Sequence, residues 1–127
     1  MTVAVPTYRR IVVPLDGSDA AEVAMGTAIS LARQHNAEIV LLTIEHLPAE
    51  SAGLEQNGQT REQVQAYLAR LRDGLRDDGL RAQEQVIIGY ALPEALIKFL
   101  ETEHIDLIVT STQGRTGMLR WLLGNQV

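Results

Sequence analysis

The chain has 127 residues, of which 46% are hydrophobic and none is cysteine, and its formal net charge is -5 at pH 7. This length and composition are sufficient for one domain with a buried core, and they exclude a disulfide framework and a thiolate metal site. The negative charge, with arginines interleaved among carboxylates, argues against binding to nucleic acid or to an anionic membrane.

The amino-terminal residues do not resemble an export signal. Residues 1–8 lack a long apolar segment, and no apolar run in the chain approaches the roughly 18 residues that a membrane span requires. We therefore expect a soluble, unexported protein and take the cytoplasm as its location by default.

Four short apolar runs are predicted to form strands. They are residues 11–13, 39–44, 86–88 and 107–109. These runs are rich in β-branched residues and nearly continuous rather than alternating. That pattern is typical of parallel strands that are covered on both faces.

The segment between the first two runs has apolar residues at helical spacing. We expect a helix over about Ala20–His35, capped by Ser18 or Asp19. Glu22 stands three residues after Asp19, as it would in a capping box.

Two further helices are predicted in the segments that follow. The first comes after an irregular loop at residues 47–59 and ends near Gly79. Its polar face is expected to be solvated charge, formed by Arg61, Glu62, Arg70, Arg72, Asp73 and Arg76. The last helix has Pro93 in its first turn and ends near His104.

The element order is therefore βαβαβαβ, which implies an α/β fold with right-handed crossovers. The result is a doubly wound, open parallel sheet of the Rossmann-like kind. Ligands of such sheets bind beyond the carboxyl ends of the strands, where the strand order reverses. With the strand order 3-2-1-4, this point lies between the first and fourth strands.

A tight turn, Pro14-Leu15-Asp16-Gly17-Ser18, follows the first strand at this point. The Asp16 carboxylate could accept hydrogen bonds from a ribose or a base edge. Alternatively, Asp16 and Ser18 would only cap the helix that follows.

A glycine-containing loop follows the fourth strand. Residues 110–117 read Thr-Ser-Thr-Gln-Gly-Arg-Thr-Gly, and nine residues separate Gly114 from the pair Gly124-Asn125. Small residues allow the backbone to fold closely around a phosphate with its N–H groups directed inward. The loop therefore predicts a phosphate-binding role, although glycines in such loops are often only turn formers.

At these motifs the chain resembles the universal stress protein family over nearly its whole length. Members open with a strand that ends in a V-P-x-D-G-S turn, matched by residues 13–18. Nucleotide-binding members carry G-x-x-G-x9-G-[S/T] after the fourth strand. In this register Ser111 stands at the first glycine, Gly114 at the second, Gly124 at the third and Asn125 at the hydroxyl position.

The resemblance implies an ATP-binding, or adenine nucleotide-binding, protein that regulates a stress response rather than an enzyme. Magnesium would be carried in with the nucleotide. The implied nucleotide-binding residues are Pro14, Asp16, Ile44, Thr110, Ser111, Gly114, Gly117, Gly124, Asn125 and Gln126. The resemblance places Pro14, Asp16 and the Ile44 backbone at the nucleoside end, with Thr110 and Ser111 beside it. Gly114, Gly124, Asn125 and Gln126 would line the phosphates.

The chain departs from the family pattern at Ser111 and after the glycine motif. Members continue with a helix and a fifth strand, through which they commonly dimerise, whereas this sequence stops at Val127. We therefore expect one domain over residues 1–127 without these last elements, and self-association as a homodimer or larger species.

Two other functions remain open. A ligand-free interaction module of the same fold would be compatible with Ser111 and the shorter end. A slow ATPase is the third hypothesis, but the sequence has no P-loop lysine and no Gly-x-Ser-x-Gly elbow. The histidines, at positions 35, 46 and 104, lack the spacing of a metal site, so we expect no protein-bound metal and no catalytic residues.

Overall fold

The computed structural model describes residues 7–15, 19–46, 61–89 and 92–111, which form four strands and three helices in alternation. In chain order they are β1 (Arg10–Pro14), α1 (Asp19–His35), β2 (Glu38–His46), α2 (Arg61–Asp77), β3 (Arg81–Gly89), α3 (Leu92–Thr102) and β4 (Leu107–Ile108). The predicted βαβαβαβ order is confirmed. The first helix begins within one residue of its predicted start, and Pro93 lies in the first turn of α3 as expected.

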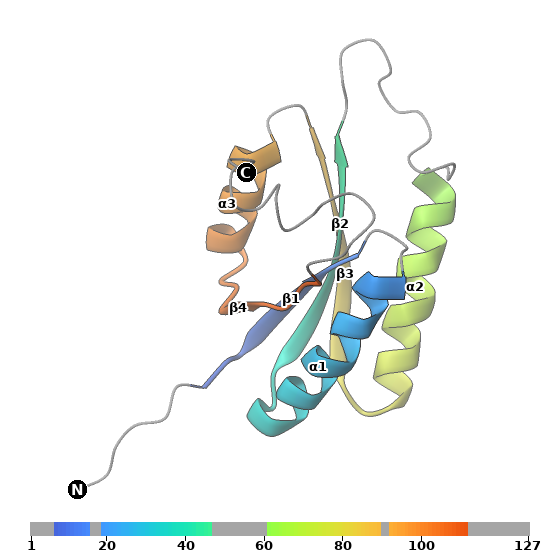
Figure 1. The fold of residues 1–127 in the computed structure, drawn as a ribbon, viewed down its shortest axis with the longest axis vertical. Helices are drawn as coiled ribbons and strands as arrows, with labels where there is room; N and C mark the ends of the chain where they lie inside the picture. The colour runs from blue at the N-terminus through green and yellow to red at the C-terminus, as the bar shows by residue number, and fades with distance from the viewer. Residues whose placement is uncertain (1–6, 16–18, 47–60, 90–91, 112–127) are drawn as a thin grey trace, which may run out of the picture.

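The four strands form one parallel sheet in the order β3-β2-β1-β4, so the predicted α/β fold and strand order are confirmed. Helices α1 and α2 cover one face of this sheet, and α3 covers the other (Figure 1). The arrangement is doubly wound because the first two crossovers pass over one face of the sheet and the third passes over the other.

Each face of the sheet has its own apolar cluster, because side chains along a strand point alternately to the two faces. Ile11, Val13, Ile39 and Leu41 pack against α1 and α2, while Val12, Val40, Leu42 and Ile44 face α3. The three residues 11–13 of the central strand β1 are fully buried. The apolar runs in β1 and β2 are therefore continuous because both faces of these strands are covered, as the sequence predicted.

Strand β3 is longer than its apolar run predicts. It spans residues 81–89, and the run at 86–88 is only its carboxyl-terminal part. In the preceding part Ala82 is buried, Gln83 and Glu84 are half-buried and Gln85 is exposed. Polar residues are tolerated here because β3 pairs only with β2 and lies at the edge of the described sheet.

The prediction that the polar face of α2 is simply solvated charge is wrong for Arg72. Its guanidinium donates to Glu84 of β3 at 2.5 Å and to Asp73 at 3.0 Å, and its side chain is only 24% exposed. Hydrogen bonds to Asp73 and then to Glu84 raise the pKa of Arg72 above its ordinary value. The pair Arg72–Glu84 connects the helix to the edge strand.

All three helices end in the same backbone motif at the amino edge of the sheet. The residues that leave the helices, Asn36, Gly79 and His104, have positive φ angles of 55°, 87° and 54°. The next residue in each case, Ala37, Leu80 or Ile105, donates its N–H to a carbonyl five positions back, at 2.9 to 3.0 Å. This is the Schellman pattern, in which a left-handed residue lets the last helical carbonyls find partners.

We predict that Gly79→Ala destabilises the protein, because alanine at a φ of 87° pays the cost of the left-handed conformation. The expected loss is about 1 kcal/mol in the free energy of unfolding measured by urea denaturation.

Gly74→Ala is the matched control, since Gly74 lies inside α2 with nothing within 4 Å of an added Cβ. This change should stabilise by about 0.5–1 kcal/mol through helix propensity. Equal effects of the two substitutions would contradict the assigned turn.

Candidate functional site

The carboxyl ends of β1, β2 and β4 form the edge where the sequence places the nucleotide. Val12 pairs with Ile108, and the Val109 N–H donates to the Val12 carbonyl at 3.0 Å. Two residues further along this register, Pro14 is level with Thr110. On its other side Pro14 pairs with Leu42. The structure therefore brings together Pro14 and Thr110, two predicted site residues that are far apart in the sequence.

Pro14 also limits the hydrogen bonding between β1 and β4 at this row. The carbonyl of Val12 is directed to β4, so residue 14, two positions on, is directed to the same strand. Proline has no N–H, so Pro14 cannot donate the next ladder hydrogen bond to β4. The registered pairing of β1 with β4 ends at Val12 and Ile108, and the Val109 N–H to the Val12 carbonyl follows it.

Ile44 can contribute to this edge only through its backbone. Its side chain is 6% exposed and packs in the apolar cluster beneath α3. Leu42 accepts a hydrogen bond from β1 through its carbonyl, so Ile44, two residues on, directs its N–H and C=O to the same side. Its position lies two residues beyond the row that contains Pro14. This agrees with the prediction that the Ile44 backbone, not its side chain, faces the site.

A second set of contacts fixes the start of the loop that follows β1. The Leu15 N–H donates to the Leu42 carbonyl at 2.7 Å, and the Thr43 hydroxyl donates to the Leu15 carbonyl at 3.3 Å. Leu15 itself is 1% exposed. The sequence analysis did not single out Thr43, although a threonine inside an otherwise apolar run was the available signal.

The remaining predicted site residues lie outside the described part of the chain. They are Asp16, Gly114, Gly117, Gly124, Asn125 and Gln126. Ser111 is described and half-buried, directly after Thr110. The structure thus describes four of the predicted residues, and both the nucleoside half and the phosphate half of the site stay predictions.

Metal and membrane features were also searched within the described residues. Across residues 7–15, 19–46, 61–89 and 92–111, no three His, Asp or Glu side chains gather in a way that would hold a metal ion. His35 accepts the Tyr8 N–H at its Nδ1 at 3.5 Å and packs edge-on against the Tyr8 ring. Of the helices in the described part of the chain, none combines the length and apolar character needed to cross a membrane.

The family model described as the universal stress protein family matches residues 7–127 of the sequence. The chain belongs to this family. Universal stress protein MJ0531 of Methanocaldococcus jannaschii is 31% identical over 124 residues, which cover 93% of this chain and 72% of that protein. The predicted family membership is therefore confirmed by sequence as well as by fold.

Solved structures of universal stress proteins share the fold. A family member from Burkholderia pseudomallei superposes with a TM-score of 0.69 at 21% identity, covering 94% of this chain and 91% of that one. A universal stress protein crystallised in complex with cAMP has a TM-score of 0.61 at 26% identity, covering 94% of this chain and 84% of that one. The bound cyclic nucleotide belongs to that protein.

We predict that Thr43→Val loosens the start of the β1–α1 loop. The substitution keeps the shape of the buried side chain but removes the hydroxyl that the Leu15 carbonyl accepts from. The expected loss is about 1 kcal/mol in the free energy of unfolding, measured by denaturation. Thr43→Ser is the control, since it keeps the hydroxyl and should retain the hydrogen bond to the Leu15 carbonyl. A smaller loss of stability in the valine variant than in the serine variant would contradict a stabilising role of this hydrogen bond.

Proposed function

We propose that this member of the universal stress protein family binds ATP, or a related adenine nucleotide, at the carboxyl edge of β1 and β4 and acts as a regulatory module in a stress response. The nucleoside would rest against Pro14, Asp16 and the backbone of Ile44, beside Thr110 and Ser111. The phosphates would be held by the backbone of the loop with Gly114, Gly117 and Gly124, together with Asn125 and Gln126.

One observation carries this proposal: the strand order of the sheet reverses between β1 and β4, and Pro14 at the end of β1 is level there with Thr110. Open parallel sheets bind ligands in the crevice at such a reversal. The residues level with this point are Pro14 and Thr110, and both were predicted from the sequence to contact the nucleotide. The cAMP complex of a related universal stress protein supports an adenine-containing ligand for this fold.

We infer a regulatory role because the sequence contains no P-loop lysine and no nucleophile elbow that would activate a group for phosphate transfer. Magnesium would enter on the phosphate oxygens, since it needs few protein ligands in such complexes. The cytoplasm, where ATP is abundant, is the compartment that fits this role. Slow hydrolysis is the less favoured enzymatic alternative.

A ligand-free interaction module of the same fold is the second candidate, and Ser111 in place of a glycine favours it. A serine Cβ would take up space beside the nucleotide that glycine leaves open. Mass spectrometry of gently denatured protein separates the two functions, because co-purified ATP is expected only for the binding module.

We also propose that the protein self-associates along β4. In the described residues β4 is a two-residue strand that pairs with β1 on one side only, and Leu107 and Ile108 are half-buried. A half-covered apolar edge favours pairing with another chain. Light scattering over a dilution series should detect a dimer or larger species, whereas a stable monomer at tens of micromolar would refute this proposal.

The test of the nucleotide site is Gly114→Val. The branched side chain would occupy the space proposed for the phosphates, so ATP binding measured by calorimetry should be lost. The circular dichroism spectrum should stay unchanged, because Gly114 lies outside the described helices and strands.

Gly74→Val is the matched control, since the same side chain is added to an open, exposed position of α2. It should leave ATP affinity unchanged. Wild-type affinity in the Gly114→Val protein would overturn the site, and equal loss in both variants would attribute the effect to general damage.

A further inference from the structure

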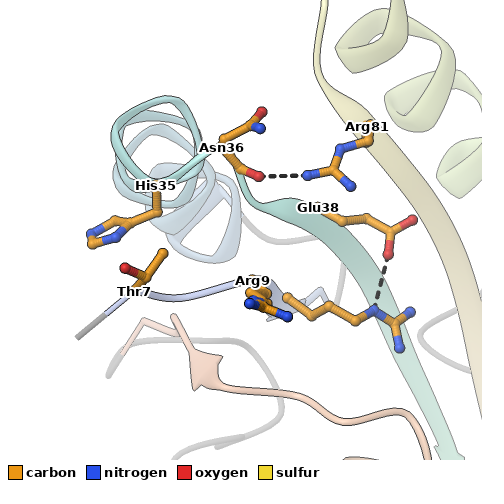
Figure 2. Close-up of a pocket in the computed structure, with 7 residues that line it drawn as sticks. Thr7, Arg9, His35, Asn36, Glu38 and Arg81 are labelled. Carbon is orange, nitrogen blue, oxygen red and sulfur yellow. Dashed lines mark hydrogen bonds and ion pairs between the residues drawn. The ribbon is translucent and has the colours of Figure 1, made fainter.

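A hollow of about 450 Å³ opens at the amino edge of the sheet, opposite the proposed nucleotide site. Its lining comes from segments that are distant in the sequence (Figure 2). These are Arg9 and Arg10 at the start of β1, His35 and Asn36 at the end of α1, Glu38 of β2 and Arg81 of β3. This volume is within the range of small-molecule sites, and the lining side chains are polar or charged.

The carboxylates around this hollow are already engaged. Glu38 accepts from Arg10 Nε at 2.9 Å, and Glu103 accepts from Arg10 Nη1 at 3.3 Å. Asp106 Oδ2 accepts the backbone N–H groups of Arg9 and Arg10 at 2.7 and 3.0 Å. Two of these carboxylates thus pair with Arg10, and the third accepts two backbone donors, so none of them is paired with Arg9 or Arg81.

Of the guanidinium groups that line the hollow, those of Arg9 and Arg81 have no carboxylate partner among the described residues. Arg9 makes its described hydrogen bond through its backbone N–H. Arg81 donates from Nη2 to the carbonyl of Asn36 at 2.5 Å, which orients the guanidinium but does not neutralise its charge (Figure 2). Among the residues that line the hollow, three arginines face one carboxylate, Glu38, so the lining itself is positively charged.

The carboxyl end of α1 faces the same region and would disfavour an anion through its partial negative charge. That charge is reduced here by two hydrogen bonds. The Ala37 N–H donates to the Ala32 carbonyl, and Arg81 donates to the Asn36 carbonyl. His35 accepts at Nδ1 from the Tyr8 N–H at 3.5 Å, which orients its ring at the rim of the hollow.

We propose that this hollow is a second ligand site, which binds a small phosphorylated molecule through Arg9 and Arg81. Guanidinium groups present paired N–H donors that match phosphate oxygens. The polar lining disfavours an apolar ligand. Arg10 and Pro14 stand at opposite ends of β1, about 13 Å apart at roughly 3.3 Å per residue, so this site is separate from the proposed nucleotide site.

The test uses inorganic pyrophosphate as the probe, titrated into the full chain at low ionic strength and followed by amide NMR shifts. We expect shifts around residues 8–10, 35–38 and 80–82. Arg9→Gln and Arg81→Gln should each weaken binding about fivefold, because each removes one charged hydrogen-bond donor group. Arg9→Gln is the cleaner variant, since no described contact of its side chain is lost.

Two controls separate a site from general charge attraction. Arg70→Gln removes the same charge from an exposed position of α2 and should leave the affinity unchanged. Glu38→Gln removes the acid that pairs with Arg10. It should tighten pyrophosphate binding about threefold, because it removes a negative charge that repels the anion.

The proposal fails if pyrophosphate produces no shifts around the hollow, or if Arg70→Gln weakens binding as much as Arg9→Gln. It also fails if Gly114→Val abolishes all pyrophosphate binding, because the probe would then occupy the proposed nucleotide edge alone. Retained pyrophosphate binding by Gly114→Val, lost on adding Arg9→Gln and Arg81→Gln, is the expected result.

Discussion

Strand β1 is hydrogen-bonded along both of its edges and buried on both of its faces, and the other elements are arranged around it. It pairs with β2 through residues 10–14 and with β4 through Ile11 and Val12. Because Ile11, Val12 and Val13 are fully buried, each face of the sheet needs a helical cover: α1 and α2 on one side, α3 on the other. The central position of β1 also defines where the strand order reverses.

The two ends of β1 have different chemistry. At the carboxyl end, Pro14 lacks the N–H that would donate to β4, and the residues around it are uncharged. At the amino end, Arg10 forms ion pairs with Glu38 of β2 and with Glu103 in the turn before β4. The carboxyl end is the edge where we propose that a nucleoside binds. The amino end is an ionic cluster that connects three segments.

The sequence was sufficient for the strand order because strands covered on both faces leave continuous apolar runs, as in residues 39–44. It was insufficient where an element lies at an edge: the amino half of β3 is polar, and Arg72 forms an ion pair that no local pattern indicates. At the carboxyl edge, the family resemblance singled out Pro14 and Thr110, which the register places level with each other, and their contact with a nucleotide stays a prediction. The amino-edge hollow was missed because the pairing of β1, β2 and β3 is what brings Arg9 and Arg81 to the same hollow. The sequence of each segment by itself does not indicate this pairing.

The three Schellman turns fix the number of residues in the connections that join each helix to the next strand at the amino edge of the sheet. Only Asn36 and Ala37 separate α1 from β2, and both are part of the turn's hydrogen-bonded ring. An insertion or deletion of one residue there would displace the left-handed position, and a one-residue slip of the strand would reverse which side chains face each layer. Relatives with this architecture are therefore expected to diverge at the amino edge by substitution, with insertions and deletions accommodated in other connections.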